Sequence, residues 1–341
     1  MNNKKILCTI GPGSLNKKII KNLEMTGCSL FRVNLSHTKI KDLEDVITQI
    51  REFTDVPICL DSEGAQIRTT KFNHDFKLGE TYTLHNSENT FSLRPFEIIN
   101  QLTPGDIISI DFNAALVKVI EVLKNKLIVE TINPGKTGEN KAVTIMKDIN
   151  IPAFSDKDYE AFKIGSKLGI KNYALSFASS GQFVNELRSL VPKNSFIISK
   201  IESKKGIKNL LEIINHSDAI LIDRGDLSRE VSLEKIPFFQ KAIIKQTVQL
   251  KKEVFVATNL LESMIENPSP TRAEVNDVYN TLLDGATGLV LAAETAIGKF
   301  PCESASIVKN IINCYNSFEG RSDINFNDHE ELLALFDEKN D

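Results

Sequence analysis

The sequence predicts an α/β fold, a (β/α)8 barrel with a small β domain inserted after the third strand. Short apolar runs with the length of buried strands alternate with amphipathic helical patterns along most of the chain. The alternation breaks between about Thr70 and Asn150, where the apolar period falls to two and turn residues crowd together. Outside that break the chain shows eight strand patterns, each followed by a helix, over roughly 240 residues, which is the count of a closed barrel.

The composition narrows the class of protein. The 341 residues carry a net charge of -4, without the basic footprint of a nucleic-acid-binding domain. The N-terminal segment turns into a strand almost at once, and no run of roughly 18 apolar residues appears. The five cysteines are scattered without a C-x-x-C pair, which favours reduced thiols over disulfides or a zinc site. We therefore expect a cytoplasmic protein with no nucleic-acid and no membrane partner.

Three strand patterns and two helical patterns open the chain. The strands are KKILCTI, Ser29–Ser36 and VPICLDS, and the helices are Leu15–Thr26 and Ile40–Phe53. Their short connections indicate a parallel sheet covered on both faces. In the second strand a period of two puts Arg32, Asn34 and Ser36 on one face, which points inward if the other, apolar face packs on helices. The third strand carries Asp61 near its end.

The insertion has the pattern of an antiparallel β domain. Runs such as KLGETYTL, TPGDIISIDF and KNKLIVETI alternate in polarity and are separated by Pro-Gly and Asn-Lys turns. They predict a small antiparallel barrel or sandwich. We therefore place the barrel domain at 1–70 and 151–320, the inserted domain at 71–150 and an acidic tail at 321–341. In the tail, EELLALF could form one short helix or fray.

From Ser155 onward helices alternate with five further strands. The helices span Asp156–Leu168, Gly181–Leu190, Lys205–Asn215, Leu233–Lys251, Glu274–Leu283 and Cys302–Phe318, and the strands are NYALSF, FIISKIES, AILIDRGD, EVFVATN and GLVLAAET. In a (β/α)8 barrel the functional groups gather at the carboxyl ends of the strands. The groups that fall there are Arg32, Asp61, Lys200, Glu202, Asp226, Thr258 and Glu294. An open doubly wound sheet is disfavoured because no G-x-G-x-x-G follows the first strand.

Charged residues end two neighbouring strands in the stretch Ser195–Glu230. A period of two puts Lys200 and Glu202 on one face of FIISKIES, and Asp226 ends the next strand one helical crossover later. Two carboxylates that converge there would suit Mg²⁺. A lysine beside them could neutralise a transferring phosphoryl group. Spacing alone leaves an alternative open, a Lys–Glu ion pair that caps the core.

Several longer strings resemble the signature blocks of pyruvate kinases. They are ISKIES, RGDL, ATNLLESMIENPSPTRAE and AAETAIGKFP, with KILCTIGP, FRVNLSH and LDSEGAQIRT nearer the N-terminus. The resemblance covers about Lys4–Glu319 and keeps the family's order. It implies a (β/α)8 barrel with a mobile β lid after the third strand. It also implies transfer of a phosphoryl group between phosphoenolpyruvate and ADP to give pyruvate and ATP, using Mg²⁺ and usually K⁺.

The resemblance assigns roles by residue match. Glu202 and Asp226 would bind Mg²⁺, and Lys200 would stabilise the phosphoryl group in flight. The backbone around Gly225 and Asp226, with the hydroxyl of Thr258, would receive the substrate carboxylate. The remaining matches concern K⁺ and the adenine nucleotide: Asn34, Ser36, Asp61 and Ser62 would bind K⁺, Arg32 and Arg68 would contact phosphates, and Pro12, His37 and Lys141 would lie near the nucleotide.

Several positions depart from the family pattern. In LDSEGAQIRT, Glu63 replaces a lysine and Gln66 a glutamate, and the neutral amide of Gln66 leaves the K⁺ requirement open. Ala292 removes a hydroxyl implicated in delivering the proton to the enolate, and Ile297 removes a lysine near the nucleotide phosphates. Ser228 stands where the family has glycine.

The chain also ends where the family continues into a C-terminal domain. We therefore expect no sugar-phosphate allostery and no response to fructose 1,6-bisphosphate, while the PTRAE helix of the barrel could still support a homodimer. Three alternatives stay open: a relative with a changed acceptor or donor in a specialised pathway, a non-catalytic regulatory homologue, and a Mg²⁺-dependent carbon–carbon lyase that works without ADP. The non-catalytic protein predicts loss of Lys200, Glu202 or Asp226, and all three are present.

Overall fold

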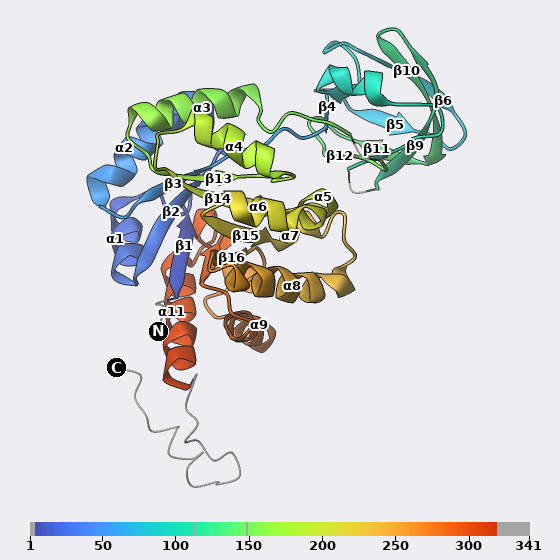
Figure 1. Ribbon diagram of the computed structural model, residues 1–341. Coiled ribbons are helices and arrows are strands. Elements are labelled where there is room, and N and C mark those ends of the chain that lie inside the picture. The colour runs from blue at the N-terminus through green and yellow to red at the C-terminus, as the bar shows by residue number, and fades with distance from the viewer. Residues whose placement is uncertain (1–3, 112, 148, 319–341) are drawn as a thin grey trace, which may run out of the picture. The chain divides into compact units, whose positions relative to one another are not determined.

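The computed structural model describes residues 4–111, 113–147 and 149–318, and the chain divides into two compact units. The barrel unit comprises Met1–Glu63 and Asp156–Asp341, and the inserted unit comprises Gly64–Ser155. In Figure 1 the first is a ring of strands enclosed by helices and the second consists mainly of strands. The acidic tail expected at 321–341 lies outside the described residues. None of the described helices is long and apolar enough to cross a membrane.

Eight parallel strands close the barrel, which confirms the fold predicted from the alternation of strands and helices. Each strand pairs with the next, and the last pairs with the first. In order around the barrel they are β1 (Lys5–Thr9), β2 (Cys28–Asn34), β3 (Ile58–Asp61), β13 (Asn172–Leu175), β14 (Phe196–Ile201), β15 (Ala219–Asp223), β16 (Glu253–Ala257) and β17 (Gly288–Leu291).

Helices follow the strands and enclose the barrel (Figure 1). The α-helices are α1 (Lys17–Met25), α2 (Leu43–Phe53), α3 (Asp156–Lys167), α4 (Gly181–Leu190), α5 (Lys204–Lys208), α6 (Leu210–His216), α7 (Arg224–Leu227), α8 (Ile236–Gln249), α9 (Arg272–Leu283), α10 (Ala293–Ala296) and α11 (Pro301–Phe318). Short 3-10 turns are η1 (Ile40–Asp42), η3 (Leu233–Lys235) and η4 (Glu262–Ile265).

Among the helices that differ from their predicted bounds, two do so because of single side chains. The helix predicted at Lys205–Asn215 is two helices, because Asn209 leaves helical geometry and its amide donates to the carbonyl of Ser179 at 2.7 Å. Helix α9 begins before the predicted Glu274 because Thr271 caps it. The Thr271 hydroxyl accepts from the Glu274 N–H while the Glu274 carboxylate accepts from the Thr271 N–H, so both orphan donors are satisfied.

One correction bears on the site. The run AILIDRGD is not a strand to its end: β15 stops at Asp223, and Arg224–Leu227 turns into the short helix α7. The Asp223 side chain caps that turn by accepting from the Asp226 N–H at 3.5 Å. Asp226 therefore lies one helical turn beyond the strand end where the sequence pattern placed it.

The barrel interior is apolar and receives side chains from all eight strands. Its members are Leu7, Leu30, Cys59, Ala174, Ile198, Ala219, Leu221, Phe255, Ala257 and Val290, each at most 9% exposed. Small alanines stand beside Phe255 and the leucines, so a packed layer fills the barrel without a pore. A strand places every second side chain on the same face. The residue two positions beyond an interior residue therefore also faces inward, nearer the carboxyl end.

The inserted unit is built of antiparallel strands around its own core. A five-stranded sheet runs in the order β12 (Val143–Ile145), β8 (Ile107–Ile110), β9 (Ala115–Leu123), β10 (Lys126–Asn133), β6 (Thr81–His85). Two smaller pairs join β11 (Gly135–Thr137) to β5 (His74–Phe76) and β4 (Arg68–Thr69) to β7 (Leu93–Arg94), and Phe96–Gln101 forms the 3-10 helix η2. The β9–β10 hairpin turns at Asn125, whose φ of 66° suits asparagine.

An imidazole lies within the aromatic core of this unit. The His74 ring centroid lies 4.4 Å from that of Phe76, 4.6 Å from Tyr82 and 5.0 Å from Phe91. Its Nε2 is buried and has no hydrogen-bond partner among the described residues. Burial lowers the pKa of His74, although the carboxylate of Asp75 acts in the opposite direction. The ring is therefore packed as a neutral aromatic group.

The inserted unit should lose stability as the solution becomes acidic. Because the pKa of His74 is lower in the folded chain than in the unfolded chain, unfolding takes up a proton. The stabilisation is complete above the ordinary histidine pKa and is lost as pH falls through the lowered value. We expect peptides of the inserted unit to exchange backbone deuterium faster at pH 5.5 than at pH 7.5, after correction for intrinsic rates. His74→Phe should remove most of that difference, and an unchanged pH response in this variant would contradict the assignment.

Candidate functional site

The positions of the charged residues at the carboxyl end of the barrel follow from the two-residue period of the strands. Interior apolar residues are succeeded two positions later by Arg32 on β2, Asp61 on β3, Lys200 on β14 and Asp223 on β15. These four residues are at most 7% exposed. The carboxyl end of the barrel therefore holds a buried cluster of opposite charges directly above the apolar layer.

Lys200 is the centre of that cluster. Its Nζ lies 2.9 Å from Oε1 of Glu202, 3.4 Å from Oδ2 of Asp61 and 3.7 Å from Oδ2 of Asp223. It also donates to the hydroxyl of Ser176 at 3.1 Å. Burial by itself lowers the pKa of Lys200, but attraction to the three carboxylates outweighs it and the pKa is raised. Lys200 is thus a fixed positive charge at the end of β14.

Arg32 supplies a second buried cation. Its Nε donates to Oδ2 of Asp61 at 2.7 Å, and a terminal nitrogen lies 2.5 Å from the same oxygen. The other terminal nitrogen donates to the hydroxyl of Thr9 at 3.0 Å. Asp61 therefore lies between the two cations Arg32 and Lys200. The sequence left open whether Lys200 and Glu202 form an ion pair that caps the core or part of a catalytic site. In the structure, ion pairs do cap the core, and the candidate catalytic groups belong to the same cluster.

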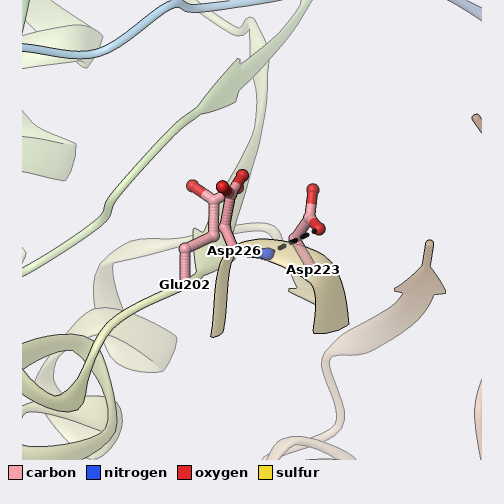
Figure 2. Close-up of side chains that lie close together, drawn as sticks. All are labelled: Glu202, Asp223 and Asp226. Atoms are coloured by element: carbon pink, nitrogen blue, oxygen red, sulfur yellow. Dashed lines mark hydrogen bonds between the residues drawn. The ribbon is translucent and has the colours of Figure 1, made fainter. Parts of the chain in front are cut away.

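Three carboxylates converge beside Lys200. One oxygen from each of Glu202, Asp223 and Asp226 lies within 4.8 Å of the others, and Figure 2 shows all three groups pointing to the same side. The sequence pattern had found two of them. Asp223 was missed because the predicted strand ran on to Asp226. Every second residue of β15 faces inward, and counting these positions would have found Asp223 after Ala219 and Leu221.

The donor set fits a divalent cation. Glu202 is 1% exposed, and its Oε2 accepts from the Phe177 N–H at 2.6 Å, whereas its buried Oε1 faces the Lys200 ammonium at 2.9 Å. Burial raises the pKa of Glu202 to about 8. The negative charges of Asp223 and Asp226 also raise this pKa, whereas the positive charge of Lys200 lowers it. Carboxylates crowded in this way repel each other, and Mg²⁺ prefers oxygen ligands of this kind. Glu202 and Asp226 are the residues that would hold it.

The Asp223 carboxylate accepts hydrogen bonds from neighbouring residues of the chain. Its Oδ1 accepts from the hydroxyl of Thr258 at 2.7 Å and from the Asp226 N–H at 3.5 Å. Burial alone raises its pKa, but Lys200 and Arg32 outweigh burial and the pKa of Asp223 is lowered. Asp223 is therefore an ionised anchor that orients Thr258 and the turn of α7.

Thr258 occupies a backbone conformation that is unusual for a β-branched residue. Its φ is 76°, in the left-handed region, which costs of the order of 1–3 kcal/mol. The guanidinium of Arg224 holds it there by donating to the Thr258 carbonyl at 2.7 and 3.0 Å. A Cβ on Gly225 would lie 2.8 Å from Cγ2 of Thr258, so glycine permits this close approach. The predicted carboxylate-binding residues Gly225, Asp226 and Thr258 are thus neighbours.

The four residues predicted to bind K⁺ lie at the ends of β2 and β3. Asp61 and Ser62 are buried, Asn34 is partly buried and Ser36 is exposed. Oδ1 of Asn34 accepts from the Ser36 N–H at 2.9 Å, and Asn34 and Asp61 are register partners. Oγ of Ser62 accepts from the Ser176 N–H at 2.9 Å. Their role as K⁺ ligands stays a prediction.

The residues predicted near the nucleotide lie on exposed loops. Pro12 and His37 are exposed, after β1 and β2. The Pro12 loop is tied to the loop after β17 because the Gly13 N–H donates to the Ala296 carbonyl at 2.7 Å. The next residue, Ile297, is 62% exposed and offers no charge to a phosphate. These placements leave the nucleotide roles as predictions.

Two predicted site residues belong to the inserted unit. Arg68 donates to the Gln66 side chain at 2.8 Å and to the Asn140 carbonyl at 3.3 Å. Lys141 is exposed and its Nζ lies 3.3 Å from Oδ2 of Asp111. Their roles toward phosphates stay predictions.

Glu294 does not join the charged cluster. Its Oε1 accepts from the Leu261 N–H at 3.1 Å and its Oε2 from the Ala292 N–H at 2.8 Å. It therefore connects the loops after β16 and β17. The sequence pattern placed Glu294 on the strand GLVLAAET, but β17 ends at Leu291 and Glu294 lies in the short helix α10, where its carboxylate accepts backbone hydrogen bonds.

Comparisons with known proteins agree on one family. The family model described as pyruvate kinase, barrel domain, matches residues 1–305. The pyruvate kinases of Thermotoga maritima and Clostridium perfringens are each 34% identical to the chain, with 91% of this chain and 70% of theirs covered. A crystal structure of a pyruvate kinase from Cryptosporidium parvum is 29% identical and superposes with a TM-score of 0.84, covering 94% of this chain and 70% of that one.

Proposed function

The chain belongs to the pyruvate kinase family, and we propose that it is a phosphotransferase that moves a phosphoryl group between phosphoenolpyruvate and ADP to give pyruvate and ATP. The observation that supports this most directly is the intact cluster of Lys200, Glu202 and Asp226 at the carboxyl end of the barrel. Phosphoryl transfer is mainly positioning and charge neutralisation, so cations and metal ligands suffice where no nucleophilic side chain is present.

Mg²⁺ is the proposed cofactor. Glu202 and Asp226 would hold it, and when bound it would neutralise charge on the phosphoryl and enolate oxygens. The chain's own residues supply the rest. Lys200 is positioned by three carboxylates and Ser176, so its ammonium would stabilise the phosphoryl group without a costly reorganisation.

The substrate carboxylate is proposed to bind beside α7. Thr258 presents a hydroxyl whose orientation Asp223 sets, and Gly225 leaves room for the close approach of a ligand. K⁺, bound by Asn34, Ser36, Asp61 and Ser62, is a further proposal, as are the nucleotide contacts of Arg32, Arg68, His37, Pro12 and Lys141. A cytoplasmic location and a homodimer through α9 are proposed with them.

A coupled assay tests the proposal. Pyruvate formation is measured from phosphoenolpyruvate, ADP and Mg²⁺, with and without K⁺. Robust turnover would establish the kinase and show that Ala292 and Ile297 are tolerated. If turnover is absent while phosphoenolpyruvate and Mg²⁺ still bind by calorimetry, the second candidate holds: a relative with a changed acceptor or donor, which the exposed apolar side chain of Ile297 near the predicted nucleotide site favours. Failure of both turnover and binding would leave the non-catalytic homologue.

Gly225→Ala should impair substrate binding without unfolding the chain. The new methyl group would lie 2.8 Å from Cγ2 of Thr258 and push its hydroxyl away from the site. We expect kcat/KM for phosphoenolpyruvate to fall about ten- to a hundredfold, as small misplacements of positioning groups do.

A second substitution checks the reason for that loss. Thr258→Ser keeps the hydroxyl and removes the methyl group that collides. In the Gly225→Ala background it should restore most of the lost kcat/KM. Failure to restore activity, with both variants folded by circular dichroism, would show that the collision with Thr258 is not the cause.

A further inference from the structure

In the carboxylate cluster, Asp226 pairs with an arginine, whereas Glu202 and Asp223 lie beside a lysine. Oδ1 of Asp226 lies 2.8 Å from a terminal nitrogen of Arg229, and the two side chains are 25% and 27% exposed. Glu202 and Asp223 instead have the buried Lys200 within ion-pair distance. The predicted metal ligand that faces solvent is therefore neutralised by a residue that is itself partly in solvent.

Local backbone geometry holds this pair together. The Arg229 N–H donates to the carbonyl of Asp226 at 3.1 Å, so both residues share one turn. The Ser228 N–H donates to the Arg224 carbonyl at 3.1 Å, and the Ser228 hydroxyl donates to the Gly225 carbonyl at 2.7 Å. Ser228, where the family has glycine, thus contributes a hydrogen bond to the turn that presents the guanidinium to Asp226.

A guanidinium beside Asp226 weakens this carboxylate as a metal ligand. It occupies lone pairs of the oxygen that it faces, and its positive charge repels an approaching divalent ion. The attraction within a partly exposed ion pair is small, so Arg229 can exchange its partner at low cost. Guanidinium groups bind phosphate and carboxylate oxygens in the same bidentate manner, so an anionic substrate offers an alternative partner.

We propose that Arg229 couples metal binding to anion binding at this site. Without an anion it neutralises Asp226 and keeps the divalent cation weakly bound. When an anionic ligand of the phosphate–carboxylate class binds, the guanidinium transfers to the ligand's oxygens and Asp226 becomes fully available to the metal. Arg229 is then a positioning and specificity residue. This inference rests on the proposed metal site.

Calorimetric titration with Mn²⁺, in the absence of ADP so that no turnover occurs, tests the coupling. Titrations are made with and without phosphoenolpyruvate on the full chain. For Arg229→Gln we expect Mn²⁺ alone to bind about fivefold more tightly than to the wild type, because a nearby positive charge is gone. We expect the tightening that phosphoenolpyruvate produces to be smaller in this variant by at least the same factor, since linkage makes the coupling reciprocal.

Two control variants sharpen the test. Arg229→Lys keeps the charge and should stay close to the wild type for Mn²⁺ alone. Arg188→Gln removes a guanidinium with the same 2.8 Å contact to a carboxylate, Asp218, which precedes β15 at the opposite end of the barrel, and should leave both titrations unchanged.

The outcomes distinguish a failure of the Arg229 coupling from a failure of the metal site. Tighter Mn²⁺ binding with reduced coupling in Arg229→Gln supports the inference. Wild-type affinity and coupling in that variant overturn it while leaving the metal site in place, and tighter binding with unchanged coupling also overturns it. If Mn²⁺ binds to neither protein, with or without phosphoenolpyruvate, the proposed metal site is wrong and the inference fails with it.

Discussion

Replacing Lys200 with methionine should abolish phosphoryl transfer. Methionine preserves the length of the side chain but removes the positive charge that three carboxylates and Ser176 hold in place. The loss of one preorganised electrostatic contact in an active site typically lowers kcat about a hundred- to a thousandfold. We expect at least that loss, because Lys200 also orders the carboxylates around it. The measurement is the coupled pyruvate assay at saturating Mg²⁺ and phosphoenolpyruvate.

The stability of this variant needs a separate measurement. Removing Lys200 leaves buried carboxylates without their counter-ion, and breaking such a pair costs about 3–5 kcal/mol when the remaining charge stays buried. Part of that cost is avoidable, because Glu202 already has a pKa raised to about 8 and can accept a proton. We therefore expect a folded protein with a lower melting temperature.

A matched control distinguishes catalysis from folding. Lys252→Met removes a lysine whose Nζ donates to the Ser217 carbonyl at 2.7 Å, just before β16 and at the opposite end of the barrel. It should keep near wild-type turnover. Wild-type turnover in a folded Lys200→Met protein would contradict the assignment of Lys200 to the phosphoryl group.

The barrel itself could be predicted from the sequence because its signals are local. Each strand is a short apolar run, each helix an amphipathic one, and their alternation forces parallel neighbours. Two of the helix boundaries that were predicted wrongly depend on single hydrogen bonds. The break at Asn209 and the early start of α9 at Thr271 are set by side chains that satisfy backbone groups, and periodicity does not register them.

The candidate site was predicted less completely than the fold. Lys200 and Glu202 followed from the period of a strand. Asp223 was missed, and Asp226 was placed on a strand that had already ended, because the pattern does not show where β15 gives way to α7. The ion pair between Asp226 and Arg229 joins the residue predicted to end a strand to one beyond it on the same turn, so sequence alternation could not indicate it.

Glu202→Gln should weaken divalent-cation binding more than Asp223→Asn does. Both substitutions replace a carboxyl group beside Lys200 with a neutral amide. They differ in what the carboxylate does. Glu202 is one of the two proposed metal ligands, and its Oε1 faces the Lys200 ammonium at 2.9 Å. By contrast, Oδ1 of Asp223 already accepts from the Thr258 hydroxyl and the Asp226 N–H. We expect Mn²⁺ affinity to fall at least about tenfold in Glu202→Gln, the loss expected when a metal ligand or its support is removed.

Asp223→Asn should instead act through Thr258. Its neutral carbonyl oxygen can still accept the Thr258 hydroxyl, so Mn²⁺ affinity should change only a few-fold while the KM for phosphoenolpyruvate rises. Calorimetry with Mn²⁺ and steady-state kinetics on both variants give the comparison. If Asp223→Asn lost Mn²⁺ affinity as strongly as Glu202→Gln, Asp223 would have to be counted as a third metal ligand. The orientation of Thr258 would then depend on the bound cation, because the carboxylate that fixes its hydroxyl would also be coordinating the metal.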